Sequence, residues 1–185
     1  MVSVILFRAQ PFHYGHLSIV KEAFEDSKRN NCDLWIFIGS ADKHGTKRNP
    51  FDIQFRMSVV EETLGSLNLL EDFVHIKPLV DLSDEANNTF GWGDYLFKSI
   101  TDLTRDNDIT MWYTDNPSIM LSWFSPEVAK YMRYKFLSRT DDISATKVRQ
   151  AVLAMDWDQL LDLVPITVYR RKQEMYDILN EIYNN

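Results

Sequence analysis

The sequence is poor in the residues that build several common kinds of site. Its 185 residues include one cysteine, Cys32, so an internal disulfide and a cysteine-rich zinc site are excluded. We therefore expect a reducing compartment. The formal net charge of −7 argues against broad binding to nucleic acid or to an anionic membrane surface, because both need a basic field. Any phosphate ligand must then be held locally.

Long apolar runs, internal repeats and low-complexity tracts are also missing. No segment approaches the roughly 18 apolar residues of a membrane span. The amino terminus MVSVILFRAQ has neither a basic n-region nor a small-residue cleavage pattern, so we expect a cytoplasmic protein. With 45% hydrophobic and 25% charged side chains, the chain is long enough to bury a core. We expect one domain over residues 1–185, with residues 144–185 as its helical C-terminal part.

Apolar patterns of two kinds alternate along the chain. Short apolar runs predict strands, the last of them weakened by Lys and Arg, at residues 2–7, 33–40, 73–79, 108–114 and 131–137. Helices are predicted between them: one after His16, one after Pro50 with Asp52 as its N-cap, and one striped by Trp92, Leu96, Ile100 and Leu103. From Ser144 the pattern is helical, with one helix at ISATKVRQAVLAM, a short one at DQLLDLV and a third after Pro165. This order predicts an α/β fold with a doubly wound, Rossmann-like parallel sheet and a C-terminal helical segment.

The stretch RAQPFHYGH, residues 8–16, joins the first predicted strand to the first helix. In a doubly wound sheet, ligands bind outside the carboxyl ends of the strands. Gly15 lets the backbone approach a ligand, and the start of the helix favours a phosphate. His13 and His16 can donate hydrogen bonds to phosphate oxygens. The residues alone leave a phosphate site and a pair of histidines without function both open, while a zinc pair lacks further ligands.

A second stretch, ISATKVR, residues 143–149, opens a helix near the other end of the chain. Ser144 is a natural N-cap, Thr146 lies in the first turn and Arg149 follows three residues later. Hydroxyls, free N–H groups and a guanidinium can thus converge on one anion. By itself this stretch is more typical of an ordinary capped helix with an exposed arginine. Two such stretches about 130 residues apart, each opening a helix, are less expected by chance.

Both stretches resemble signatures of the nucleotidyltransferase superfamily, R-x-Q-P-x-H-x-G-H and I-S-x-T-x-[IV]-R. Three further segments, residues 38–56, 77–92 and 112–117, resemble the archaeal-type nicotinamide-nucleotide adenylyltransferases. Two departures stand out, because Phe7 and Asp115 replace glycines that are usual in that family. Phe7 would crowd a backbone approach to the ligand.

The resemblance implies an enzyme of NAD biosynthesis that joins ATP and nicotinamide mononucleotide to give NAD and pyrophosphate. It also implies roles by position. The catalytic residues would be His13, His16 and Arg149. The ATP-binding residues would be Gln10, Gly15, Asn116, Ser144, Thr146 and Arg149. The residues that bind the mononucleotide would be Arg8, Gly39, Ser40, Asn49, Phe51, Arg56 and Trp92.

Some of these residues have a second interpretation. Trp92 shares a helical spacing with Leu96 that is typical of a core, but we favour stacking on nicotinamide because Trp92 begins its helix beside a polar loop. Arg56 either reaches a phosphate or forms a surface ion pair with Glu61 or a neighbouring residue. The loop cations Lys47 and Arg48 either close over the triphosphate or are solvated.

A divalent cation, Mg²⁺, is expected to bridge triphosphate oxygens. The sequence shows no dedicated carboxylate cage, so we assign no residue to the metal. The expected partners are ATP and the mononucleotide, with no nucleic acid or membrane and with a homo-oligomer left open. Two other functions stay open: another transferase of the superfamily, acting on phosphopantetheine, flavin mononucleotide or glycerol phosphate, and a non-catalytic NAD or ATP sensor, which the departures at Phe7 and Asp115 favour. Nicotinamide and nicotinate mononucleotide are not distinguished.

Overall fold

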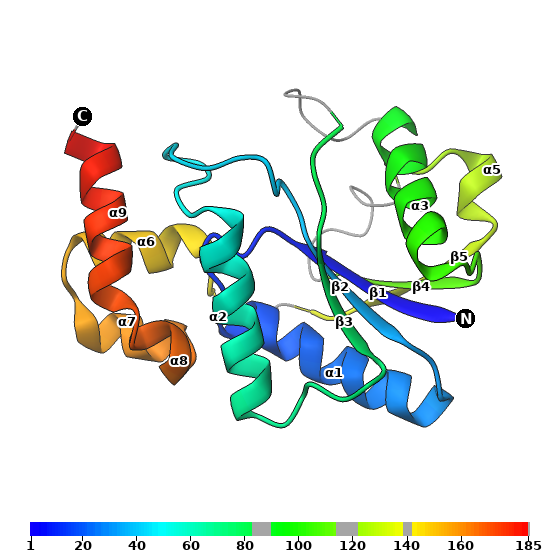
Figure 1. The fold of residues 1–185 in the computed structure, drawn as a ribbon, viewed down its shortest axis with the longest axis horizontal. Helices are drawn as coiled ribbons and strands as arrows, with labels where there is room; N and C mark the ends of the chain where they lie inside the picture. The colour runs from blue at the N-terminus through cyan, green and yellow to red at the C-terminus, as the bar shows by residue number, and fades with distance from the viewer. Residues whose placement is uncertain (83–89, 114–121, 139–141, 185) are drawn as a thin grey trace.

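The five predicted strands all form, and they assemble into a parallel sheet. A computed structural model describes residues 1–82, 90–113, 122–138 and 142–184. The strands are β1 (Val2–Phe7), β2 (Leu34–Ile38), β3 (Val74–Pro78), β4 (Ile109–Tyr113) and β5 (Met132–Phe136). Their order in the sheet is β3-β2-β1-β4-β5, and each neighbouring pair is parallel (Figure 1). The order reverses between β1 and β4, so the predicted doubly wound sheet is confirmed.

Helices cover both faces of this sheet (Figure 1). One face carries α1 (Tyr14–Asn30) and α2 (Ile53–Ser66), whereas the other carries α3 (Phe90–Thr104) and the short α5 (Pro126–Ala129). The C-terminal helices pack beside α2, at one end of the molecule (Figure 1). The C-terminal helices are α6 (Ala145–Leu153), α7 (Trp157–Leu163), α8 (Ile166–Tyr169) and α9 (Lys172–Asn184). The single helix predicted after Pro165 is wrong, because a turn at Arg170 and Arg171 separates α8, which packs on α2, from α9, which packs on α6.

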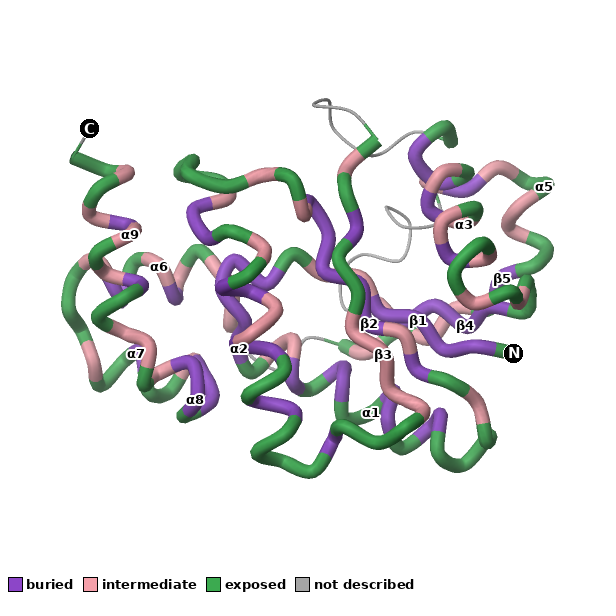
Figure 2. The backbone as a smooth tube through the Cα atoms, viewed as in Figure 1, coloured by how far each residue is buried: buried purple, intermediate pink, exposed green. Residues whose placement is uncertain are grey.

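Burial explains why the strands are almost continuously apolar. In β1, Val2 and Val4 belong to the core under α3, while Ile5 belongs to the core under α1 and α2. Both faces of the sheet are therefore covered at its centre, where β2, β1 and β4 are mostly buried, whereas the edge strands β3 and β5 are largely half-buried or exposed (Figure 2). The helix predicted from Trp92, Leu96, Ile100 and Leu103 is confirmed as α3, whose apolar stripe is buried as far as Ile100, while Leu103 in the last turn is exposed.

The weakest strand prediction is confirmed as β5, and the charged side chains of this strand are accommodated in ion pairs. Arg133 forms an ion pair with Asp108, and Lys135 Nζ lies 2.6 Å from Asp26 Oδ1 on α1. Asp52 is confirmed as the N-cap of α2, since its Oδ1 accepts the backbone N–H of residue 55 at 2.7 Å. None of the described helices is both long enough and apolar enough to cross a membrane.

Candidate active site

A cavity of about 710 Å³ opens at the carboxyl end of β1, beside the point where the strand order reverses. Residues of both predicted motifs line it, so the two stretches lie at one site although they are far apart in the sequence. The described residues that line the cavity include no Asp or Glu. The lining residues that we predicted as functional are Arg8, Gln10, His13, Gly15, His16, Ser144, Thr146 and Arg149.

The two histidines lie face to face at the start of α1. His13 is the N-cap of this helix, and its Nδ1 accepts the backbone N–H of Gly15 at 3.1 Å. A neutral imidazole whose Nδ1 accepts carries its proton on Nε2, so Nε2 is the donor of this ring. The rings of His13 and His16 stack with their centroids 3.8 Å apart. A Cβ atom at Gly15 would lie 3.0 Å from His13 Cε1, so any larger residue would push on the imidazole.

Phe7 occupies a place that the sequence did not indicate. Its side chain is not part of the cavity lining, so the predicted crowding of the ligand by this side chain is not seen. The Phe7 ring instead packs against His16, with 4.6 Å between the ring centroids, and Phe12 lies 5.6 Å from the same imidazole. Three rings therefore surround His16, those of Phe7, Phe12 and His13, and they restrict its orientation.

The second motif contacts the first directly. Ser144 is confirmed as the N-cap of α6, because its Oγ accepts the backbone N–H of Lys147 at 3.3 Å. Arg149 donates from Nη1 to the backbone oxygen of Gln10 at 2.7 Å and from Nη2 to Thr146 Oγ1 at 3.4 Å. Its Nε is buried and has no hydrogen-bond partner among the described residues. Arg149 thus links the two motifs.

Arg8 brings a further positive charge to the cavity. Its Nη1 lies 3.5 Å from Asn49 Oδ1 on the loop after β2. Partial burial lowers the pKa of Arg8, the charges of Arg48 and Arg149 lower it further, and Asp81 acts in the opposite direction. Cations that already repel one another favour an anionic ligand between them.

Arg56 is the buried support of this site. It is 1% exposed, and burial lowers its pKa to about 10, although the charge of Asp52 opposes the shift. The guanidinium donates to four backbone oxygens: Arg8 at 2.9 Å, Gly39 at 2.8 Å, Ser40 at 2.9 Å and Asp52 at 3.1 Å. Arg56 therefore ties the carboxyl ends of β1 and β2 to the start of α2.

Comparisons with known proteins agree with this geometry. Residues 8–151 match the family described as cytidylyltransferase-like. The chain belongs to this family. It is 30% identical to a nicotinamide-nucleotide adenylyltransferase of Methanococcus maripaludis over 98% of the chain and 94% of that protein. It is 29% identical to a protein of the same name from Methanococcus aeolicus over 87% of the chain and 83% of that protein. The predicted relation to the nicotinamide-nucleotide adenylyltransferases is thus confirmed.

A solved structure from Francisella tularensis has the same fold as this chain. That protein is a bifunctional NMN adenylyltransferase/ADP ribose pyrophosphatase complexed with AMP and a Mn ion. It superposes with a TM-score of 0.69 at 23% sequence identity, over 98% of this chain. The chain spans 51% of the length of the bifunctional protein, so the likeness is to about half of it. At this identity the likeness concerns the fold alone.

Three residues predicted to bind the mononucleotide take places in or beside the core. Trp92 is 6% exposed and meets Trp123 edge to face, with 4.8 Å between the ring centroids. Phe51 is 0% exposed and stacks on Phe55. The burial of Arg56 shows that its predicted surface ion pair with Glu61 is wrong. These places favour packing and support, and the substrate contacts of the three residues stay predictions.

Other predicted residues hold the loops around the cavity. The amide of Gln10 pairs with the backbone of Phe51 in both directions, with both hydrogen bonds at 3.0 Å. Gly39 and Ser40 offer their backbone oxygens to Arg56, as described above. Asn116 lies outside the described residues.

Several lining residues were missed by the sequence analysis. Tyr14, Ser18 and Lys21 line the cavity from one side of α1. They follow one another at spacings of four and three residues and begin inside the histidine motif, and this helical spacing was the signal that could have found them. Of the two loop cations left open above, Arg48 lines the cavity, whereas Lys47 does not. Ser138, just after β5, also lines the cavity and carried no recognisable signal.

Proposed function

We propose that this chain is a nicotinamide-nucleotide adenylyltransferase, which joins ATP and nicotinamide mononucleotide to give NAD and pyrophosphate. The names of the relatives that match nearly the whole chain support this reaction. The cavity supports it independently, because its chemistry suits a triphosphate.

The observation that carries the proposal is the charge of the cavity. The chain as a whole has a net charge of −7, yet the described lining contains four cations, Arg8, Lys21, Arg48 and Arg149, and no carboxylate. The first turns of α1 and α6 also line it, and the backbone N–H groups of a helix start attract phosphate. An acidic protein that concentrates positive charge at one site is suited to bind a polyanion there.

The reaction requires positioning rather than a covalent enzyme intermediate. A phosphate oxygen of the mononucleotide forms a bond to the α-phosphorus of ATP. The bond from that phosphorus to the oxygen bridging it to the β-phosphate breaks, and pyrophosphate leaves with both electrons of that bond. Groups that align two anions and stabilise the developing charge supply most of the catalysis.

The residues divide these tasks according to their places. His13, as an Nε2 donor, and His16 would hold the ATP phosphates. The hydroxyls of Ser144 and Thr146, with the guanidinium of Arg149, would stabilise the β- and γ-phosphates that leave. Arg8 would hold the phosphate of the mononucleotide.

A divalent cation, Mg²⁺, would neutralise part of the triphosphate charge. Among the described residues, no group of three His, Cys, Asp or Glu could hold a metal ion, and no carboxylate lines the described cavity. The donor set therefore fits an ion held by phosphate oxygens and water rather than by a protein cage. The residues of this chain would bind the phosphates around that ion.

The test is turnover with ATP, Mg²⁺ and a panel of acceptors, with pyrophosphate release as the signal. The panel contains nicotinamide mononucleotide, nicotinate mononucleotide, flavin mononucleotide, phosphopantetheine and glycerol phosphate. We expect turnover with one or both pyridine mononucleotides. Turnover with another acceptor alone would assign the chain to a different transferase.

The variant His16→Ala separates an enzyme from a sensor. Loss of one preorganised donor lowers the turnover number about 100-fold or more, while the affinity for the mononucleotide should be largely kept. A wild-type protein that binds ATP or NAD, yet releases no pyrophosphate with any acceptor, would be a sensor.

A further inference from the structure

The loop of residues 41–50, between β2 and α2, carries Arg48 to the cavity. Its tip is closed by two hydrogen bonds: the Thr46 N–H donates to Asn49 O at 3.2 Å, and the Asn49 N–H donates to Thr46 Oγ1 at 3.0 Å. Arg48 is one of the two residues between Thr46 and Asn49 in this turn. A contact that fixes the tip of the loop therefore also fixes the start of the Arg48 side chain.

The C-terminal helix supplies such a contact. Lys47 Nζ lies 5.0 Å from the centroid of the Tyr183 ring, in the last turn of α9. Two neighbouring cations of one turn thus have different surroundings, Lys47 on the aromatic ring and Arg48 at the cavity. Figure 1 shows α9 rising on the same side of the molecule as this loop.

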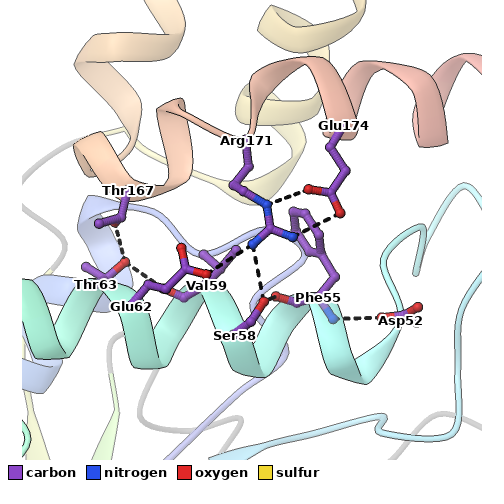
Figure 3. A network of polar contacts seen from close by, with 9 residues as sticks. All are labelled: Asp52, Phe55, Ser58, Val59, Glu62, Thr63, Thr167, Arg171 and Glu174. Atoms are coloured by element: carbon purple, nitrogen blue, oxygen red, sulfur yellow. Dashed lines mark hydrogen bonds and ion pairs between the residues drawn. The ribbon is translucent and has the colours of Figure 1, made fainter.

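The other end of α9 is anchored on α2 (Figure 3). Arg171, immediately before α9, donates to Ser58 Oγ and to Glu62 Oε1 on α2, both at 3.3 Å, and it also pairs with Glu174. Its guanidinium lies 4.9 Å from the ring centroid of Phe55, also on α2. The start of α9 is thereby held on the helix that follows the 41–50 loop, so α9 can act as a fixed support for the loop tip.

We propose that Tyr183 is a positioning residue, which holds the 41–50 loop through Lys47 and so keeps Arg48 at the cavity. The inference rests on the proposed function, because Arg48 would contact the triphosphate of ATP. Residues 152–185 lie outside the segment that matches the family, and this contact gives their last helix a part in the active site. The ring face, rather than the hydroxyl, makes the contact.

The experiment compares three variants of the full-length protein. Tyr183→Leu removes the aromatic face, and Tyr183→Phe keeps it. Tyr131→Leu is the matched control, because Lys130 Nζ also lies 5.0 Å from the Tyr131 ring centroid, and Tyr131 does not line the cavity. Tyr183 and Tyr131 are similarly exposed, at 40% and 46%. Thermal unfolding checks that each variant is folded.

Two measurements are made on each variant. Limited trypsin digestion gives the cleavage rate after Lys47 and Arg48, which reports on the loop whether or not the protein is an enzyme. Steady-state kinetics give the KM for ATP and the turnover number. For Tyr183→Leu we expect faster cleavage at this loop and a KM for ATP raised about two- to fivefold, as the loss of an exposed cation–π contact implies. Tyr183→Phe and Tyr131→Leu should match the wild type in both.

The double variant Lys47→Met/Tyr183→Leu tests the coupling. The single variant Lys47→Met is measured beside it. The KM for ATP of the double variant should be no higher than that of the poorer of Lys47→Met and Tyr183→Leu, because both changes break the same contact. An unchanged cleavage rate in Tyr183→Leu would overturn the inference, and so would faster cleavage with an unchanged KM. A wild-type protein without any turnover would refute the proposed function instead, and the digestion would still decide whether Tyr183 holds the loop.

Discussion

The buried Arg56 gives the sharpest prediction about how the site is built. In Arg56→Met, the carbonyl groups of Gly39 and Ser40 lose their buried donors. An unsatisfied buried carbonyl costs about 1–3 kcal/mol, so the two together cost about 2–6 kcal/mol. Removal of a buried charge offsets part of this loss. We therefore expect a net loss of about 2–4 kcal/mol in the free energy of unfolding, combining the hydrogen-bond loss with the relief of that burial.

The conservative variant Arg56→Lys should be no more stable than Arg56→Met. A lysine keeps the buried charge, but its single ammonium group cannot span carbonyl groups at the ends of two strands as the planar guanidinium does. Thermal unfolding should show a drop of roughly 4–16 °C for either variant, from about 2–4 °C per kcal/mol for a chain of this size. The value of kcat/KM should fall in parallel, because the backbone of Arg8 loses its support.

The control for this series is Glu61→Gln. Glu61 is the partner that a surface arginine would have had. Because Arg56 is instead buried and bonded to backbone oxygens, Glu61→Gln should keep the unfolding temperature and the kcat/KM of the wild type. An Arg56→Met protein that unfolds at the wild-type temperature and loses only turnover would refute the structural role of Arg56. That result would mean that Arg56 contacts the substrate.

Two further variants test other parts of the fold. Gly15→Ala should lower turnover without lowering the unfolding temperature, because its Cβ would press on His13 Cε1 at 3.0 Å while alanine favours the helix; an unchanged turnover would contradict this placement. Asp26→Asn should lower the unfolding free energy at pH 7 by about 1.5–3 kcal/mol, by loss of a charged hydrogen bond to Lys135. Burial alone would raise the pKa of Asp26, but Lys135 and Arg29 outweigh it and the pKa is lowered. This stabilisation is therefore present above the unfolded pKa near 4 and is lost as the pH falls through the lower folded pKa. Urea titrations from pH 6 to pH 2 should show that the free energy of unfolding falls less in Asp26→Asn than in the wild type.

The sheet and the convergence of the two motifs at one site could be predicted from the sequence. Strands covered on both faces need continuous apolar runs, and such runs are visible without a structure. The convergence of the two motifs was predictable because both resemble signatures of one superfamily; their helix starts and anion-binding residues alone had left each of them open. Even the charged β5 was found, although Asp26, the carboxylate that pairs with its Lys135, lies on a helix distant in the sequence and could not be read from local pattern.

The roles of individual large residues were harder to predict. An arginine is ordinarily a surface residue, so nothing local indicated that Arg56 would be buried under carbonyl groups supplied by three other segments. For Trp92, the helical spacing indicated the core and the family resemblance indicated stacking, and its burial agrees with the spacing. The break between α8 and α9 had no signal, because the turn at Arg170 and Arg171 contains neither glycine nor proline.

The contact of Arg149 with Gln10 has a consequence for how the protein matures. One half of the site is synthesised at the beginning of the chain and the other half only near residue 149. A growing polypeptide therefore holds an incomplete pocket until the segment around residue 149 has left the ribosome. A nucleotide that occupies the finished pocket joins both halves, so its binding would favour the fully folded chain over every partly folded one.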